Sequence, residues 1–229
     1  MSAAPAEPEA LVVLVAGSPE PTDLARVAQL CSQARYVIAA DKGYSWCRRA
    51  QVVPQLYVGD SDSVEPADLA ALESSGVARV DLSWHKDMTD LEVAFEQGEA
   101  WAVQRGASPH FVVLCALGGR LDHELAVLGT CRRYSRWAID LIGATQKVQL
   151  VAPGAREEVR VGEPGEVLSV VPLADNTSIS EEGFEWLLDH HVMDALSDRG
   201  ISNIVRASAG AVVRCHGGCA AVIQSLRER

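Results

Sequence analysis

The sequence predicts an α/β domain with a mostly parallel sheet flanked by helices, followed by an all-β antiparallel sandwich or barrel domain. Two observations predict this order. Through about residue 145, short continuous apolar runs alternate with helical patterns, as in parallel sheets whose strands are buried on both faces. After residue 145 the segments are short, often alternate apolar with polar residues, and are separated by Gly, Pro and Asn, as in antiparallel sheets.

The individual elements follow from these patterns. Strands of the first domain are expected where apolar runs end at Gly or Asp, which occurs at 11–17, 36–41, 56–60, 111–118 and 138–143, with a further candidate at 78–82. Helices are expected between them, at 22–33, 44–50, 66–75, 89–105 and 122–135. We therefore predict a disordered leader over 1–10, an α/β domain over 11–145 and a β domain over 146–229.

Composition and charge narrow the classes of function. The 229-residue chain carries a net charge of −11, which argues against binding nucleic acid through a broad basic surface. No apolar run is long enough to cross a bilayer, and the N-terminus lacks the basic and apolar regions of a signal peptide. We expect a cytoplasmic protein that binds neither nucleic acid nor a membrane.

Six cysteines are scattered along the chain. Cys115 lies within an apolar run, so a buried free thiol is expected there. The stretch "CHGGC" (215–219) allows either a metal site or a hairpin turned at Gly217-Gly218. We favour the hairpin, because no second cysteine pair with zinc-like spacing accompanies it.

The first stretch that suggests chemistry is "YVGDSDSV" (57–64). Asp60 and Asp62 follow an apolar strand and are two residues apart, so in extended backbone their side chains point the same way. A divalent cation, most simply Mg²⁺, would relieve the repulsion between them. The alternative is a solvated polar turn, which this stretch alone would favour.

The second stretch is "HKDMTDLEVAF" (85–95). Thr89 and Glu92 fit a capping box, so a helix is expected to begin at about Asp90. Asp87 and Asp90 could complete a cage for a metal and its substrate. Taken alone, the segment is a well-capped helix, and the helix dipole is a sufficient reason for Asp90.

The third stretch is "LGGRLDHELAVL" (117–128). Gly118 and Gly119 would let a phosphate approach the backbone, and Arg120 can bind phosphate oxygens with two parallel bonds. The alternative is a strand–turn–helix with Asp122 as the N-cap. His123 is either a donor to the ligand or a polar residue of the first turn. Polar residues thus gather at the predicted carboxyl ends of strands, where open parallel sheets bind ligands.

Several common motifs are absent from the sequence. It contains no G-x-x-x-x-G-K-[ST] loop, G-x-G-x-x-G fingerprint, G-x-S-x-G elbow or H-E-x-x-H helix. The usual NTPase, dinucleotide, serine-hydrolase and zinc-protease interpretations therefore lose their main support.

Five ordered motifs resemble the thiamine pyrophosphokinase (thiamine diphosphokinase) family. That family typically shows Gly-Asp-Phe-Asp-Ser, Asp-x-x-Thr-Asp, Gly-Gly-Arg-x-Asp-His, Gly-Leu-x-Trp and Ser-Asn. This chain has "GDSDS", "DMTD", "GGRLDH", "GFEW" (183–186) and Ser202-Asn203. The resemblance runs from about residue 36 to the C-terminus.

The resemblance implies transfer of a diphosphoryl group from ATP to the hydroxyethyl group of thiamine, leaving AMP. It also implies a homodimer in which ATP and Mg²⁺ bind the α/β domain and thiamine lies at the subunit interface, against the β domain. On the matching positions, the metal would be held by Asp60, Asp62 and Asp90. The residues expected to act in catalysis are Asp62, Arg120 and Asp122.

The resemblance also implies two sets of binding residues. ATP would be contacted by Asp41, Ser63, Asp87, Thr89, Gly118, Gly119, Arg120 and His123. Thiamine would be bound by Trp186, Ser202 and Asn203, with the Trp186 ring stacked on it. From the residues alone, Trp186 would instead be a core residue alternating with Phe184 in a strand, and Ser202-Asn203 a turn beside Gly200.

Four departures from the family pattern bear on the substrate. Lys42 replaces the first glycine of Ala-Asp-Gly-Gly, Ser61 an aromatic residue, Val127 an asparagine, and Glu182 a small hydroxyl residue. They leave open a pyrophosphokinase that acts on another alcohol, such as a pterin. They also leave open a non-catalytic paralogue that binds a nucleotide or thiamine compound.

Overall fold

The computed structural model describes residues 8–61, 64–82 and 87–226. The chain divides into two compact units, Met1–Gly119 and Arg120–Arg229. Within the described ranges, none of the helices combines the length and apolar character needed to span a membrane.

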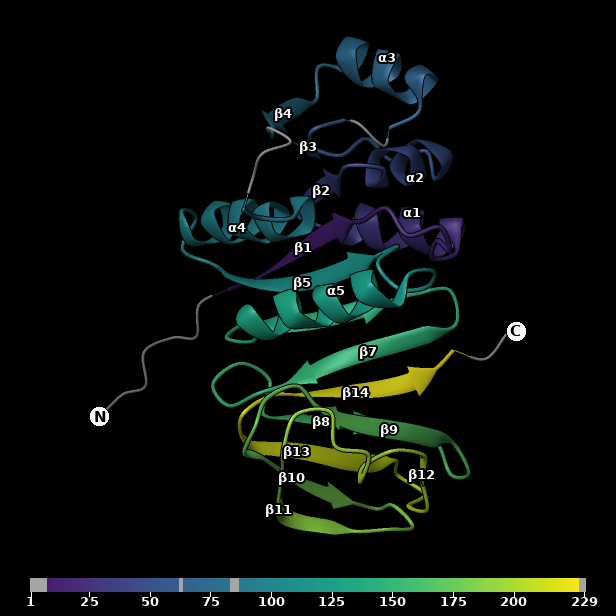
Figure 1. Cartoon of the computed structure of the whole chain (residues 1–229), viewed down its shortest axis with the longest axis vertical. Helices are drawn as coiled ribbons and strands as arrows, with labels where there is room; N and C mark the ends of the chain where they lie inside the picture. Colours follow the sequence, from purple (N-terminus) through teal and green to yellow (C-terminus); the bar gives the residue numbers. More distant parts are fainter. Residues whose placement is uncertain (1–7, 62–63, 83–86, 227–229) are drawn as a thin grey trace. The chain divides into compact units, whose positions relative to one another are not determined.

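The first unit is an α/β domain with a parallel sheet, as predicted. Its strands lie in the order β5-β1-β2-β3-β4, and every neighbouring pair is parallel (Figure 1). In chain order its elements are β1 (Glu9–Val15), α1 (Leu24–Gln33), β2 (Tyr36–Ala40), α2 (Gly43–Arg49), β3 (Leu56–Gly59), α3 (Pro66–Ser75), β4 (Ala78–Asp81), α4 (Asp90–Val103) and β5 (Ser108–Leu114).

The order of the strands fixes where the helices lie. The connections β1–α1–β2, β2–α2–β3 and β3–α3–β4 all advance toward the same edge, so right-handed crossovers place these helices on one face. The connection through α4 returns to β5 and therefore covers the other face, where α4 packs along β1, β2, β3 and β5. The continuous apolar runs fit this burial, since Leu14, Ile38 and Phe111 are fully buried.

Strand order reverses at β1, whose two neighbours are β2 and β5. In open parallel sheets the crevice at such a switch point, outside the carboxyl ends of the strands, is where ligands bind. The loops after β1 and β5, residues 16–23 and 115–119, leave the sheet at this point.

The second unit is antiparallel, which confirms the predicted all-β C-terminal region. One sheet has the strand order β6-β7-β14-β9-β12, and the other has the order β11-β10-β13-β8. The two sheets share a hydrophobic core that includes Val170, Ile179, Val213 and Val222. Its elements are α5 (Leu121–Arg133), β6 (Ala138–Ile142), β7 (Gln146–Val151), β8 (Glu158–Val161), β9 (Val167–Pro172), β10 (Thr177–Glu182), β11 (Leu188–Met193), β12 (Asn203–Ile204), β13 (Ala211–Gly217) and β14 (Ala220–Ser225).

The expected hairpin at Gly217-Gly218 is wrong. β13 pairs with β10 and β8, whereas β14 pairs with β7 and β9 in the other sheet (Figure 1). Gly218, with a φ of +77°, turns the chain from one sheet of the sandwich to the other. The six cysteines are free and buried, as expected for Cys115.

Candidate active site

Three residues at the carboxyl edge of the parallel sheet have left-handed backbone. Asp41 follows β2 with a φ of +48°, Ser61 follows β3 with a φ of +66°, and Cys115 follows β5 with a φ of +54°. Each non-glycine residue in this region costs about 1–3 kcal/mol, and such strain gathers at functional sites. Five other non-glycine residues of the described ranges also have positive φ, so it is the position of these three at the carboxyl ends of parallel strands that makes this edge the candidate site.

Charged side chains from different elements act on the Tyr57 hydroxyl: the carboxylates of Asp41 and Asp90 and, in the opposite sense, the Arg79 guanidinium. Burial raises the pKa of Tyr57 to about 12; a hydrogen bond with Ser61 opposes the rise, and the charges of Asp41 and Asp90 add to it. The Tyr57 and Ser61 hydroxyl oxygens are 3.1 Å apart. Asp41 at the end of β2 and Asp90 at the start of α4 therefore act electrostatically on the same hydroxyl.

Gly59 keeps this arrangement compact. A Cβ at this position would lie 2.7 Å from the Tyr57 hydroxyl oxygen and 3.2 Å from the Cα of Asp41. Only glycine leaves room for the loop after β2 to approach the end of β3 so closely. Asp60 follows directly, half-buried, between Gly59 and Ser61.

The donor chemistry of this edge suits Mg²⁺. Mg²⁺ prefers carboxylate oxygens, and proteins usually supply only one or two of them while substrate phosphates and water complete the shell. In the described ranges, no three His, Cys, Asp or Glu side chains come close enough together to hold a metal alone. The expected ligand Asp62 and the expected ATP contact Ser63 lie outside those ranges. Of the expected ligands, Asp60 and Asp90 lie in the described ranges, and their carboxylates are of the kind that could hold such a cation.

The glycine loop after β5 is held by the loop after β1. The Ser18 hydroxyl lies 2.7 Å from the carbonyl oxygens of both Leu117 and Gly118, and it can donate to either. Gly118 and Gly119 have φ values of +92° and +100°. Sequence reasoning missed the loop after β1, although Gly17-Ser18 directly after an apolar strand was the signal that could have found it.

Arg120 and Asp122 belong to the second unit, at the start of α5. The helix begins at Leu121 with Arg120 at the N-cap position, so the interpretation of Asp122 as the N-cap is wrong. Arg120 donates from Nε and Nη2 to the two carboxylate oxygens of Asp122, at 3.1 and 2.5 Å. This pairing lowers the pKa of Asp122 to about 2. Both side chains are exposed, as is His123, so the guanidinium is accessible to an anion from solvent.

The start of α4 is as the sequence predicts. The Thr89 hydroxyl accepts a hydrogen bond of 3.2 Å from the backbone N–H of Glu92, and the helix begins at Asp90. Asp87 lies in an exposed bend just before it. Thr89 therefore has a structural role whether or not it also contacts a ligand.

Trp186 lies outside any strand and is 59% exposed, so its interpretation as a core strand residue is wrong. Phe184 is the buried aromatic residue of this segment, and β11 begins only at Leu188. Asn203, which is buried, connects to the backbone of Trp186. Its Oδ1 accepts from the Trp186 N–H at 3.1 Å and its Nδ2 donates to the Trp186 carbonyl at 2.7 Å. Ser202 beside it is an exposed turn residue with a φ of +57°.

The four departures from the family pattern have local partners or surroundings. Lys42 precedes α2 as its N-cap residue, and Val127 is half-buried on α5. The Ser61 hydroxyl is hydrogen-bonded to the Tyr57 hydroxyl, and Glu182 forms an exposed ion pair with Arg214 at 3.1 Å. None of these contacts involves the carboxylates of Asp60 or Asp90.

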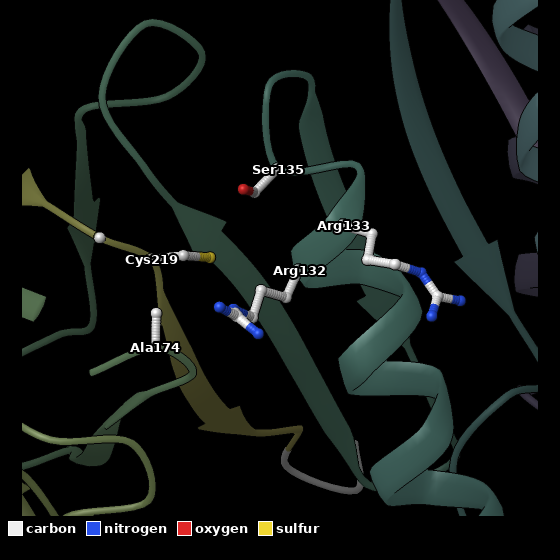
Figure 2. Close-up of a pocket in the computed structure, with 6 residues that line it drawn as sticks. Arg132, Arg133, Ser135, Ala174 and Cys219 are labelled. Carbon is white, nitrogen blue, oxygen red and sulfur yellow. The ribbon is translucent and has the colours of Figure 1, made fainter.

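A separate hollow of about 370 Å³ lies in the second unit, at the end of α5. Figure 2 shows the Arg132 guanidinium beside Cys219 and Ala174, while Arg133 points away. Burial raises the pKa of the Cys219 thiol to about 11, so the thiol is protonated and unreactive near neutral pH. The lining contains none of the residues predicted from the sequence and consists of Arg132, Arg133, Ser135, Ala174, Gly218 and Cys219.

Comparison with known proteins places the chain in a family. A model described as "Thiamin pyrophosphokinase, catalytic domain" matches residues 27–142, about half of the chain, and one described as "Thiamin pyrophosphokinase, vitamin B1 binding domain" matches residues 156–219. The chain belongs to the thiamin pyrophosphokinase family. The two matches leave 143–155 between them, and the predicted domain boundary at residues 145–146 stays a prediction.

Related sequences carry the same name at modest identity. Thiamine pyrophosphokinase 1 of Oryza sativa subsp. japonica is 28% identical over 162 residues, which are 69% of this chain and 61% of the relative. Thiamine pyrophosphokinase of Bacillus subtilis (strain 168) is 25% identical over 177 residues, 76% of this chain and 79% of the relative. The chain thus spans less than two thirds of the rice relative.

Solved structures show the same fold. Thiamine pyrophosphokinase from Bacillus subtilis superposes with a TM-score of 0.76 at 22% identity, covering 95% of this chain and 100% of that chain. Thiamin pyrophosphokinase from Candida albicans superposes with a TM-score of 0.77 at 14% identity, covering 99% and 95%. At such identities the likeness speaks for the fold alone.

Proposed function

We propose that this protein is a Mg²⁺-dependent thiamine pyrophosphokinase that converts ATP and thiamine to AMP and thiamine diphosphate. The observation that carries the proposal is that Asp41, Asp60 and Asp90 all stand at the carboxyl edge of the parallel sheet, where Gly59 lets the loop after β2 approach Tyr57 and where Asp41 and Asp90 act electrostatically on the same hydroxyl. A member of the thiamin pyrophosphokinase family that gathers carboxylates there is suited to bind a metal–nucleotide complex.

The reaction joins the hydroxyethyl oxygen of thiamine to the β-phosphorus of ATP. The bond between that phosphorus and the oxygen bridging to the α-phosphate breaks, and AMP leaves with that oxygen. Asp62 accepts the proton of the attacking hydroxyl. Asp60, Asp62 and Asp90 would hold Mg²⁺, which would neutralise phosphate charge.

The remaining groups bind and align ATP, and alignment with charge neutralisation is most of what phosphoryl transfer requires. Arg120 exchanges its bonds with Asp122 for phosphate oxygens, since its guanidinium is exposed and suits bidentate anion binding. Asp122 and Glu124 already place negative charge at the start of α5, so the arginine side chain and not the helix dipole attracts the phosphates. The other ATP contacts are Asp41, Ser63, Asp87, Thr89, Gly118, Gly119 and His123.

Thiamine binds at the Trp186 turn. The ring is exposed and offers a π-face to a cationic heterocycle, which is attracted by the ring quadrupole. Asn203 holds the backbone of Trp186 through two hydrogen bonds, and Ser202 lines the same place. The acidic composition of the chain adds a general attraction for a cation.

The proposal includes a homodimer in the cytoplasm. Six of the large apolar side chains exposed in the described ranges fall between residues 167 and 201, and a subunit interface formed by this segment would cover them. They are Val167, Trp186, Leu187, Val192, Leu196 and Ile201. Six unpaired buried cysteines suit a reducing compartment.

The test is product analysis after incubation with ATP, Mg²⁺ and thiamine. The proposal predicts equal amounts of AMP and thiamine diphosphate, and no turnover in EDTA. A pyrophosphokinase for another alcohol would release AMP only with that acceptor, so a pterin alcohol is run in parallel. Tight calorimetric binding of thiamine or ATP by folded protein without turnover would instead favour the non-catalytic paralogue.

A further inference from the structure

Glu181 is a buried acid that the proposed reaction does not use. It lies on β10 with 1% of its surface exposed. Its Oε2 accepts a hydrogen bond of 2.6 Å from Nδ2 of Asn203. Its Oε1 is buried and, in the described part of the chain, has no hydrogen-bond partner. Such a group is costly to bury, so its presence calls for a reason.

Glu181 determines how the Asn203 amide is oriented. A carboxylate only accepts hydrogen bonds, so it requires the NH₂ end of Asn203 on its side. The amide oxygen is then left to accept from the N–H groups of Trp186 and Ile204, at 3.1 and 2.9 Å. With the amide reversed, two N–H donors would face an NH₂ group.

The turn that carries Asn203 fits closely over the carboxyl group. A Cβ at Gly200 would overlap the carbonyl oxygen of Val170 and lie 3.3 Å from Oε1 of Glu181. Glu181 is therefore enclosed by the same segment that, through Asn203, holds the backbone of Trp186.

We propose that Glu181 is a positioning residue for the acceptor substrate: acting through Asn203, it fixes the Trp186 turn on which the acceptor stacks. This inference rests on the proposed function, because the stacking role of Trp186 is itself part of that proposal. Glu181 need not touch the acceptor, and its effect is expected on KM more than on kcat.

Protonation of Glu181 should weaken acceptor binding near neutral pH. Burial raises the pKa of Glu181 to about 7, and the bond from Asn203 opposes the rise. The other charged groups on the elements packed against Glu181 are exposed to solvent or pair with each other. Glu182 pairs with Arg214. The exposed ones are Asp189, His190, Asp198 and Arg199. The half-buried His191 of β11 and the exposed His216, bonded to Ser180, do not contribute to the shift. The ionised carboxylate is the stronger acceptor for Asn203, so acceptor binding should weaken as Glu181 gains a proton.

The first test compares KM for thiamine and kcat between pH 6 and 8.5 in the parent, Glu181→Gln and Glu182→Gln. The parent KM is expected to fall several-fold as the pH rises through 7, and Glu182→Gln to behave like the parent. Glu181→Gln, which keeps an acceptor but does not titrate, should flatten this dependence while the kcat profile stays unchanged. The same pH dependence of KM in Glu181→Gln as in the parent would overturn the proposal.

The second test does not need catalysis. The difference in fluorescence between the parent and Trp186→Phe isolates the emission of Trp186, and it should change with a midpoint near pH 7. The midpoint should disappear in Glu181→Gln, with circular dichroism showing that the variant is folded. If the parent has the midpoint but no activity with thiamine, the coupling of Glu181 to the Trp186 turn stands, while the proposed function and the role of that turn in binding thiamine fail. If the parent has none, the inference about Glu181 fails whatever the activity.

Discussion

Asp60 is the residue whose surroundings argue most directly for chemistry. It lies between Gly59, which the close approach of Tyr57 and Asp41 requires, and Ser61, whose backbone is left-handed. It is half-buried at the carboxyl end of β3, where open parallel sheets bind ligands. A cation supplied with the substrate would make the arrangement favourable.

Asp60→Asn should therefore lower kcat/KM by about 100-fold or more, a loss of about 2.7 kcal/mol in transition-state stabilisation. The midpoint of urea unfolding should stay the same or rise, because a repelling charge is removed. Steady-state kinetics at several Mg²⁺ concentrations checks the first expectation. Glu96→Gln, an exposed acid of the same unit, is the matched control. Normal turnover by Asp60→Asn would exclude it as a metal ligand.

Trp186 gives a second prediction at the same scale. Loss of one cation–π contact costs about 1–2 kcal/mol, so Trp186→Ala should raise KM for thiamine by about 10-fold and leave KM for ATP unchanged. Trp186→Phe should recover part of the loss because it restores an aromatic face. If both substitutions change the two KM values equally, the turn does not bind the acceptor.

The roles of some single residues can be predicted from the sequence, and those of others cannot. Thr89 was predictable because a capping box is a local pattern, and Asp60 because a carboxylate at a strand end stands out. The roles of Tyr57 and Glu181 could not be found in this way, and for Ser18 the sequence marks only the loop, not the carbonyl groups that its hydroxyl contacts. Their importance comes from contacts with Ser61, Gly118 and Asn203, and for Ser18 and Glu181 those partners are distant in sequence.

At the scale of elements, α2 depends on a close backbone approach. The helix begins at Gly43, where a Cβ would overlap the carbonyl oxygen of Val15 at the end of β1. This contact sets the position of the loop 41–43, which follows β2 at the candidate site.

Gly43→Ala should consequently destabilise the protein by about 3 kcal/mol or more, because neither backbone can move away without disturbing the sheet. Gly129→Ala is the matched control: it lies inside α5 with open space around it, and should stabilise by about 0.5–1 kcal/mol. Urea unfolding of both variants measures the difference. An unchanged midpoint for Gly43→Ala would show that α2 is placed by other contacts.

The elements show where pattern reasoning succeeds and fails. The helices and parallel strands of the first unit follow from helical periodicity and from continuous apolar runs, because each of these patterns is local in the sequence. The connection at Gly217-Gly218 does not follow from the sequence pattern, because the same turn residues can form a hairpin or connect strands of two different sheets. Only the pairing of β13 with β10 and of β14 with β7, set by distant partners, decides between them.

At the scale of the whole molecule, Glu181 should make stability depend on pH. Its folded pKa of about 7 exceeds its ordinary value of 4.5, so the folded state holds the proton more tightly. Stability from this group is fully present below pH 4.5 and lost as the pH rises through 7, by at most about 3 kcal/mol.

Urea unfolding at pH 5 and pH 8 measures this loss. The parent should lose stability between the two, and Glu181→Gln should lose less by up to about 3 kcal/mol. Glu182→Gln, whose acid is exposed and paired with Arg214, should behave as the parent does. Equal losses in the parent and Glu181→Gln would mean that the buried acid does not titrate in this range.

The most direct test of the proposed reaction follows each phosphorus of ATP into the products. With Mg²⁺, thiamine and ATP labelled with ³²P at the α, β or γ position, label from β and γ should appear together in thiamine diphosphate, and label from α only in AMP. Transfer of the γ label alone, with ADP as the second product, or no labelled thiamine compound from folded protein, would contradict the account.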